Sequence, residues 1–514
     1  MSLVMGLSVS VLVLILTLNL TASIAVFALV ISLIIFSQSF SKGWLFLFSF
    51  ILLFPAIKLG NGSLYLHDIL LIILSLAGIT ILALKNGSAK AGQNNLLFPF
   101  FLLFLLGTSI IVSGFLFKQA VEEEVWILSL SFVWFYISLF VFQYLFLSYK
   151  RLRLFFAVIM VVGALHSAFG LAMYIGGWQT SGGLGISTGK IEHMIFTEAR
   201  YRVNGFFGSG FEGRVGSNAL VPFLLISIPV TLGFYLEKRI NKAKKIHPAK
   251  HRNLLNLLRG RETKIGRLLS GHHKGQEFKV FDIKPVIFNQ ASQIGEKGVS
   301  RYTFIVKEYF EIFILLLQVV ALLLTFSYAS FIFLNVGLLV MGILLRNKRM
   351  ATWAAATIVI FTLVIPGIHS SWTSSSQKNI SDWFSGFSVI SNSWFLGNGW
   401  GVTETLPGTQ SVSIKNSYLY IWNYYGILGL IVFLFAAGKY FYDVYSAYRK
   451  SDGGKRIWLI VIISIFVELA FEALTSNVLV FGPAALVFWL LYGAVINLRE
   501  KPIMFGITET KLIQ

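Results

Sequence analysis

The sequence predicts an all-α polytopic membrane protein with about fourteen transmembrane helices, and at least twelve. Of its 514 residues, 56% are hydrophobic and 12% are charged, whereas about a quarter of the residues in a globular protein are charged. The mean hydropathy is +0.76, and apolar runs of roughly 20 residues, the length that spans a bilayer, recur along the chain. The absence of cysteine excludes disulfides, thiolate metal sites and a thiol nucleophile.

Residues 1–177 contain seven candidate membrane helices. We expect the first to remain in the protein rather than to be a cleaved signal, because Met1 to Leu20 lacks a basic amino-terminal region and a small-residue cleavage site. Pro55 interrupts the third. The seven are placed at 3–21, 23–39, 43–58, 64–84, 96–117, 125–148 and 152–177.

Seven more candidates follow, beginning with 218–236. The apolar run 309–345 is 37 residues long, too long for one span, so we expect a break near Ser327 and Tyr328. Single helices are expected at 350–369 and 418–447. The last run, 457–497, has 41 residues and is expected to turn around Ser476, Asn477 and Pro483.

The placement of lysine and arginine predicts the orientation of these helices. Inside segments of membrane proteins are enriched in both residues. With the amino terminus inside, 33 of the 42 lysines and arginines fall in inside segments. We therefore expect both termini to be cytoplasmic. Lys439 lies within a helix, and the other eight lie outside: Lys58, Lys118, Lys190, Arg200, Arg202, Arg214, Lys378 and Lys415.

This topology separates membrane helices (1–177, 218–236, 309–369 and 418–514) from three long loops. Loops 178–217 and 370–417 face outward and hold six of the eight outside cations. Loop 237–308 faces inward, with 17 basic and 6 acidic residues. Its segment 252–269 has an amphipathic pattern, typical either of a helix lying on anionic lipid or of a solvated loop. No nucleic-acid partner is expected, because stacking aromatics do not accompany the basic residues.

Three arginines mark the end of the first outward loop. Arg200, Arg202 and Arg214 precede the helix that begins near Asn218. Arginine binds diphosphate and carboxylate through a planar fork of donors, and a helix amino terminus also favours anions. The pattern therefore indicates a diphosphate site; the alternative is pairing with Glu198, Glu212 or lipid head groups.

Residues 200–497 contain four short motifs. They are Arg202, Gly205, Phe207, Gly208, Asn218, Ala219, Leu220 and Pro229; Leu324, Thr325, Phe326 and Ser327; 396–401; and Asn416, Ser417, Tyr418, Leu419, Gly426 and Gly429. In residue type and order these motifs resemble those of one membrane enzyme family, the O-antigen ligase and polymerase superfamily. The ligases usually have a histidine at the position of Lys415, many relatives have arginine at that of Tyr328, and Glu212, Gly213 and Arg214 interrupt the first motif.

The resemblance implies a GT-C-like fold whose two extracytoplasmic loops form the active site, in a bacterial cytoplasmic membrane. The implied reaction transfers glycan from an undecaprenyl-diphosphate-linked donor to a saccharide acceptor, without metal or cofactor. A polysaccharide polymerase is favoured because Lys415 replaces the ligase histidine. The alternatives are an O-antigen ligase acting on lipid A-core or protein, and a flippase or transporter of lipid-linked saccharide. Membrane lipids and a chain-length regulator are further expected partners.

The candidate catalytic residues each have an expected role. Arg202 and Arg214 would stabilise the charge of the departing diphosphate. Lys415 would be another phosphate-binding cation or the general base, and Glu404 is an alternative base. The candidate substrate-binding residues are Arg200, Asn218, Asn416, Tyr418, Glu468 and Glu472.

Glu468 and Glu472 lie one helical turn apart in an apolar run. Burying a carboxylate inside a membrane costs free energy, so such residues usually have a partner or a function. They would pair with Arg202 or Arg214, accept a proton, or pair with Lys439. No metal site is expected, because His67, His193 and His369 are isolated in the sequence.

Overall fold

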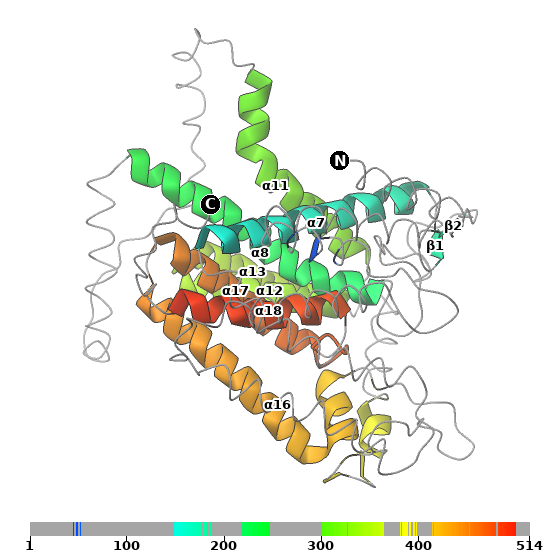
Figure 1. Cartoon of the computed structure of the whole chain (residues 1–514). Helices are drawn as coiled ribbons and strands as arrows, with labels where there is room; N and C mark the ends of the chain where they lie inside the picture. Colours follow the sequence, from blue (N-terminus) through cyan, green and yellow to red (C-terminus); the bar gives the residue numbers. More distant parts are fainter. Residues whose placement is uncertain are drawn as a thin grey trace, which may run out of the picture.

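The computed structural model describes eight helices from the part of the chain that follows residue 148 (Figure 1). The described residues are 149–176, 179–181, 185–187, 217–246, 301–363 apart from 326, and 416–499 apart from 452, 480 and 481. Residues 383–388 and scattered positions between 45 and 52 and between 381 and 414 are also described. The first six expected membrane helices, except for a few positions of the third, lie outside this set, as do segment 252–269 and the three isolated histidines.

The helices follow the expected apolar segments closely. They are α7 (Tyr149–Gly176), α8 (Ser217–Ile246), α11 (Arg301–Leu324), α12 (Tyr328–Leu344), α13 (Lys348–Leu363), α16 (Ser417–Lys450), α17 (Gly453–Glu472) and α18 (Gly482–Arg499). The described residues outside helices include one antiparallel hairpin, β1 (Gln179–Ser181) with β2 (Gly185–Ser187), in which Gln179 pairs with Ser187.

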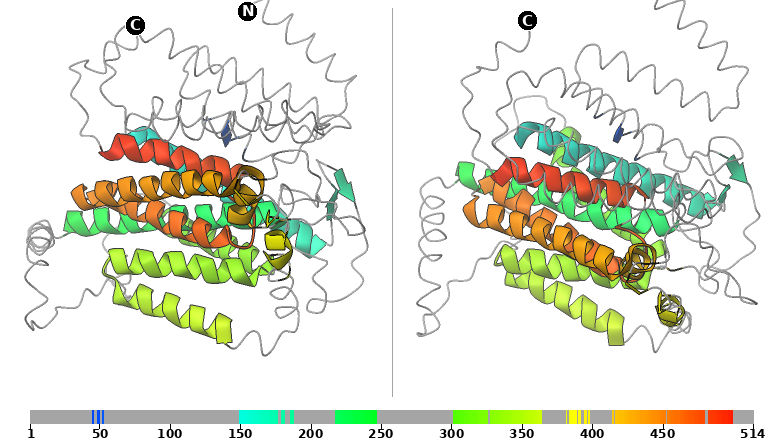
Figure 2. Two further views of the ribbon diagram at one scale, coloured as in Figure 1. Left: turned by 90° about the horizontal axis from the view of Figure 1, so that it is seen from below. Right: turned by 60° about the horizontal axis from the view of Figure 1, so that its bottom comes forward.

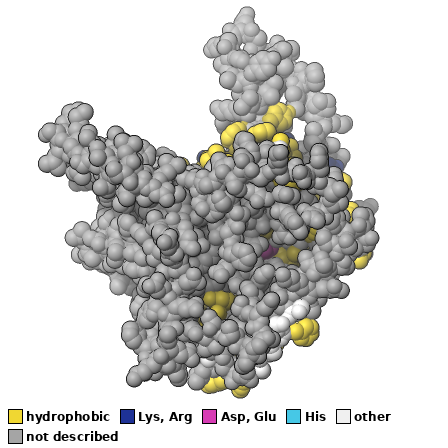
Figure 3. Space-filling view, turned by 90° about the vertical axis from the view of Figure 1, so that its right-hand side faces the viewer, with side chains coloured by type: hydrophobic (Ala, Val, Ile, Leu, Met, Phe, Trp, Pro, Cys, Tyr) yellow, Lys and Arg dark blue, Asp and Glu magenta, His cyan; other side chains and the backbone are white. Residues whose placement is uncertain are grey.

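Three of these helices are long and apolar enough to cross a membrane, as judged by length and composition: Leu152–Ala172, Leu220–Asn241 and Ser417–Lys450. Shorter apolar helices cover Tyr309–Leu324, Tyr328–Leu344 and Ala484–Gly493. Where described side chains reach the face shown in Figure 3, most are hydrophobic. The described part of the chain therefore supports a helical membrane protein.

Both long apolar runs break where the sequence predicted. α11 ends at Leu324 and α12 begins at Tyr328. In this turn the Thr325 hydroxyl donates to the Leu322 carbonyl (2.6 Å), which occupies an acceptor that the helix end leaves free. The second run breaks between Glu472 and Gly482.

α8 extends ten residues beyond the expected end of its span and takes up part of the segment assigned to the 237–308 loop. The added residues are mostly lysine, arginine and alanine, which favour helix. Two ion pairs also hold this part of α8: Arg153 Nε lies 2.9 Å from Glu237 Oε2, and Lys238 Nζ lies 2.7 Å from Glu311 Oε2.

The contacts between α7, α8 and α11 fix their directions. Near one end of the group, α8 contacts α7 through Glu237 and α11 through Lys238. Further along, a Cβ added to Gly163 of α7 would meet Ser227 of α8 and Gln318 of α11. The residue numbers rise in α7 and α11 while they fall in α8, so α8 is antiparallel to both. The start of α8 therefore lies at the end where α11 finishes.

The same end gathers several other helix termini. α12 starts there because it follows α11 after a three-residue turn. The Ser330 hydroxyl of α12 donates to Glu472, the last residue of α17 (2.6 Å), and the Ser417 amide of α16 donates to the Ala473 carbonyl (2.8 Å). We call this the Glu472 end of the bundle, and the end held by the Arg153–Glu237 and Lys238–Glu311 pairs the Arg153 end. Figure 2 shows the helices lying side by side between the two.

α8 and α17 form the centre of the described core. Trp458 of α17 is fully buried and stacks on Phe156 of α7, with ring centroids 4.4 Å apart. A Cβ added to Gly233 of α8 would press against Trp458 and Val461, so the glycine allows the two helices to approach closely. This rigid core positions the residues of the Glu472 end.

Candidate functional site

The structure describes some of the sequence-predicted site residues and not others. Asn218 is the second residue of α8, at the Glu472 end. The side chains of Asn416, Tyr418, Glu468 and Glu472 are described, and all four come from α17 or the start of α16. Five candidates lie outside the described residues: Arg200, Arg202, Arg214, Glu404 and Lys415.

Asn416 is the amino-terminal cap of α16. Its side-chain oxygen accepts hydrogen bonds from the Tyr418 amide (2.9 Å) and the Leu419 amide (3.1 Å), two of the donors that a helix start leaves free. Its side chain is therefore committed to structure, and what it contributes to a site is the fixed starting point of α16, one residue after Lys415.

The start of α16 is also tied to the connection between α17 and α18. The Ser417 hydroxyl donates to the Ser476 carbonyl (2.9 Å) and accepts from the Leu479 amide (3.3 Å). The Tyr418 hydroxyl donates to the Ala470 carbonyl (2.8 Å), and the Asn477 amide group donates to the Ile414 carbonyl (2.8 Å). The motif that resembles a helix entry is thus anchored to the helix that carries both glutamates.

A chain of hydroxyl groups leads to Glu472. The Ser330 hydroxyl donates to Glu472 Oε2 at 2.6 Å, and the Ser327 and Ser330 hydroxyl oxygens are 2.6 Å apart. Because Ser330 gives its one proton to the carboxylate, Ser327 is the donor to Ser330. Ser327 is half-buried, and its oxygen can still accept a hydrogen bond. A proton accepted there can be relayed through Ser330 to the Glu472 carboxylate.

Glu468 lies one turn further into the bundle and is completely buried. Its Oε1 accepts a hydrogen bond from Ser464 at 2.8 Å, and no hydrogen bond reaches its Oε2 from any described group. The side chain lies directly against Gly337 of α12, where an added Cβ would overlap it. Glycine at this position therefore makes room for a carboxyl group between α12 and α17.

The two glutamates have no ion-pair partner among the described side chains. Lys439, one of the expected partners, instead pairs with Asp443 on the next turn of α16. Asp443 is fully buried and also accepts from the Tyr492 hydroxyl of α18 (3.2 Å). The pairing of the glutamates with Lys439 is therefore corrected: an aspartate at i+4 on the same helix is nearer. Pairing with Arg202 or Arg214 stays a prediction.

One residue of the third motif, Gly397, packs against a glycine near the start of α16. Gly426 has φ 69° and ψ −176° and kinks the helix. Gly397 has φ 79°, and an added Cβ would overlap the backbone of Tyr424 and Gly426. The Trp394 carbonyl accepts from the Ile427 amide and from the Trp422 indole, both at 2.9 Å. Gly397, the described residue of the 396–401 motif, thus packs into the kink of α16.

Sequence reasoning missed several residues of this region. Ser330 and Gly337 become relevant only through the register of α12 against α17, which spacing alone does not give. Ser464 had a detectable signal, since it lies four residues before Glu468 and therefore on the same helix face. His166 of α7, also missed, is buried with Nε2 2.9 Å from the Leu52 carbonyl.

The chemistry available here is that of hydroxyl and carboxyl groups. Among the described residues no three histidine, aspartate or glutamate side chains form a group that could hold a metal ion. The Ser327, Ser330 and Glu472 chain can accept a proton or orient a hydroxyl. No protein-family model matches the chain, and no curated protein matches it.

Proposed function

We propose that this protein is a polysaccharide polymerase of the O-antigen, capsule or exopolysaccharide type. It would transfer undecaprenyl-diphosphate-linked glycan onto an acceptor saccharide at the outer face of a bacterial cytoplasmic membrane. The proposal includes about fourteen spans, a GT-C-like fold and two extracytoplasmic loops around the site. The Glu472 end would face outward.

One observation carries the proposal: motifs that are far apart in the sequence meet at one end of the bundle. Thr325 and Ser327 form the turn between α11 and α12, beside Glu472. Asn416 caps the start of α16, whose first residue is anchored to Ala473, and Gly397 packs on Gly426. These are the pieces on which the family resemblance rests, and a shared active site gives a reason for their assembly.

The arginine cluster supports a donor site at the same end. Arg214 precedes Ser217, the first residue of α8, by three residues, and three residues of chain reach no further than about 11 Å. Arg202 and Arg214 would hold the donor diphosphate, with Arg200, Lys415 and the start of α8 adding positive potential. Their cations would stabilise the leaving group as its charge develops.

Glu472 supplies the basic group for the acceptor. In the proposed step an acceptor hydroxyl oxygen bonds to the anomeric carbon while the bond from that carbon to the diphosphate oxygen breaks, and its electron pair stays with the diphosphate. The hydroxyl proton passes to Ser327, the Ser327 proton to Ser330, and the Ser330 proton to Glu472. Glu404 and Lys415 remain alternative bases in the second outward loop.

The test uses purified protein supplied with an undecaprenyl-diphosphate repeat unit. We expect chain growth, and we expect it to be lost in the Arg202→Ala/Arg214→Ala double variant. The matched control is the Arg153→Ala/Arg239→Ala variant, which lacks two arginines near the Arg153 end. We expect this variant to extend the glycan chain as the unchanged protein does. Growth that survives the first pair of substitutions would contradict the donor site.

The same preparation separates the alternatives. Transfer of a single glycan to lipid A-core or protein, without chain growth, would favour the ligase. Protein-dependent movement of the lipid across a bilayer, with neither reaction, would favour the flippase or transporter; the buried carboxyl group of Glu468 is a feature that such proteins share.

A further inference from the structure

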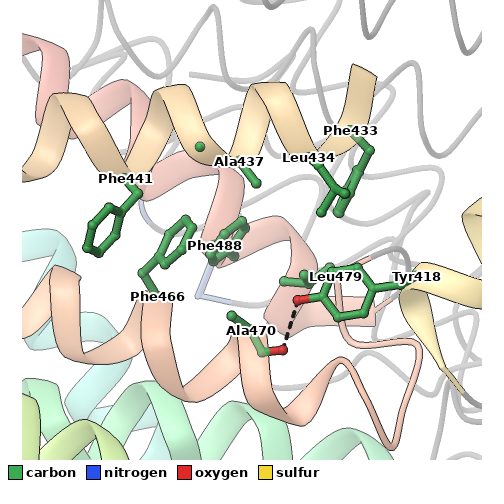
Figure 4. A pocket seen from close by; sticks show the side chains of 10 residues that line it. Tyr418, Phe433, Leu434, Ala437, Phe441, Phe466, Ala470, Leu479 and Phe488 are labelled. Carbon is green, nitrogen blue, oxygen red and sulfur yellow. Dashed lines mark hydrogen bonds between the residues drawn. The ribbon is translucent and has the colours of Figure 1, made fainter. Parts of the chain in front are cut away.

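An apolar cavity of about 300 Å³ lies between α16, α17 and α18 (Figure 4). Of the ten residues that line it, only Tyr418 has a polar side chain, and its hydroxyl donates to the Ala470 carbonyl. The remaining walls are aliphatic or aromatic. The side chains that define its shape are Tyr418, Phe433, Phe441, Phe466 and Phe488.

The cavity opens to the side of the bundle. Leu434 and Phe441, two of its lining residues on α16, are 48% and 37% exposed. Gly438 lies between them, and a Cβ added there would have no atom within 4 Å. α16 is one of the helices long and apolar enough to cross a membrane. In a bilayer this opening would face lipid hydrocarbon.

The cavity also reaches the Glu472 end. It runs along α16 from Phe441 to Phe433, a distance of about 12 Å at the helical rise. Tyr418 closes this end, where its ring packs against Phe433 with ring centroids 6.5 Å apart. The Tyr418 hydroxyl is hydrogen-bonded to the carbonyl of Ala470, which lies two residues before Glu472. An elongated ligand inside it would therefore have one end at the candidate site and the rest against the apolar walls.

We propose that this cavity binds the polyprenyl chain of the lipid-linked donor. The inference rests on the proposed function, because it places the donor diphosphate at the Glu472 end. Branched isoprene units bury apolar surface against the aromatic walls without leaving a polar group unpaired. A chain entering from the bilayer through the gap at Gly438 would reach the site without crossing water.

The test fills the cavity at its open position. Gly438→Phe places a ring where the structure has space, and it replaces a glycine inside a helix, so the fold should be retained. The matched control is Ile431→Phe, on the same helix, 56% exposed and outside the lining. Both variants are labelled in detergent with a diazirine-bearing polyprenyl phosphate, and the labelled peptides are identified by mass spectrometry.

We expect the unchanged protein to be labelled on α16, α17 and α18. In Gly438→Phe this labelling should fall roughly tenfold, because losing the burial of about two methylene groups weakens binding by about that factor. In Ile431→Phe the labelling should not change. Equal labelling in both variants, no labelling of these helices, or equal competition by a phospholipid would each overturn the polyprenyl assignment.

Chain growth with long and short donors provides a readout of the reaction. Gly438→Phe should raise the KM for an undecaprenyl donor about tenfold and leave that for a water-soluble short-chain donor unchanged. If the unchanged protein is labelled as expected but extends no glycan, the proposed function fails while the chain site stands. If it extends glycan and Gly438→Phe has no effect on either donor, the cavity assignment fails alone.

Discussion

The acidic side chains at the two ends of the described bundle have different kinds of partner. At the Arg153 end, Glu237 and Glu311 lie within 3 Å of a basic group, Arg153 or Lys238. At the Glu472 end, the described hydrogen-bond donors to the carboxyl groups of Glu468 and Glu472 are serine hydroxyls. An ion pair at the end of a bundle is explained by its contribution to structure. A buried carboxyl group that only hydroxyls contact costs folding free energy, and such groups are usually kept for a functional reason. The difference supports the proposal that the functional site lies at the Glu472 end.

The largest effect on stability is expected where the Glu472 end depends on glycine. Gly397→Ala would place a Cβ against the backbone of Tyr424 and Gly426 at a positive φ, and should destabilise the protein by about 3 kcal/mol. Thermal unfolding in detergent measures this. The control is Gly438→Ala, where no atom obstructs the Cβ and no loss is expected. Similar melting temperatures for the two variants would contradict the packing of Gly397 against the α16 kink.

A smaller loss should follow from crowding Glu468. Gly337→Ala adds a methyl group where the Glu468 side chain lies, which should cost about 2 kcal/mol. Removing the side chain in Glu468→Ala should make room for it. In a double-mutant cycle we therefore expect Gly337→Ala to be nearly neutral in the Glu468→Ala background. Additive losses would show that the two residues are not in contact.

Loss of the α16 cap should be milder. Asn416→Ala leaves the Tyr418 and Leu419 amides without their acceptor and should cost about 1 kcal/mol. Asn416→Asp keeps an acceptor oxygen and should melt close to the unchanged protein. If the aspartate variant is as unstable as the alanine variant, Asn416 acts through its amide donor rather than as a cap.

The smallest effect is expected at the Arg153 end. Glu237→Gln removes one charge of a pair whose arginine side chain is 53% exposed, so solvent screens the interaction and the loss should be about 0.5 kcal/mol. Chain growth should not change. A loss of activity in this variant with unchanged melting would remove the distinction between the two ends.

The sequence predicted the order and the breaks of the described helices because bilayer thickness limits the length of an apolar run. The run 309–345 had to turn, and Ser327 and Tyr328 marked the place, between the end of α11 at Leu324 and the start of α12 at Tyr328. The extension of α8 to Ile246 was not predicted, because a search for apolar spans stops at the first charges and ignores the helix propensity of Lys and Arg.

The side-chain partners were harder to predict. Lys439 pairs with Asp443, four residues along the same helix, so this partner follows from the i, i+4 spacing in the sequence. The contact of Ser330 with Glu472 joins positions 142 residues apart, and it depends on how α12 is rotated against α17. The kink at Gly426 could not be predicted either, since glycine inside an apolar run indicates close packing as often as a bend.

Two matched substitutions test most directly whether the Glu472 end carries out the reaction. Glu472→Gln and Glu311→Gln each remove one carboxylate with little change in volume, one from each end. In the chain-growth assay we expect Glu472→Gln to slow extension about a hundredfold, as when a positioned base is lost. We expect Glu311→Gln to extend glycan at the rate of the unchanged protein. Extension by Glu472→Gln at the unchanged rate would contradict the account.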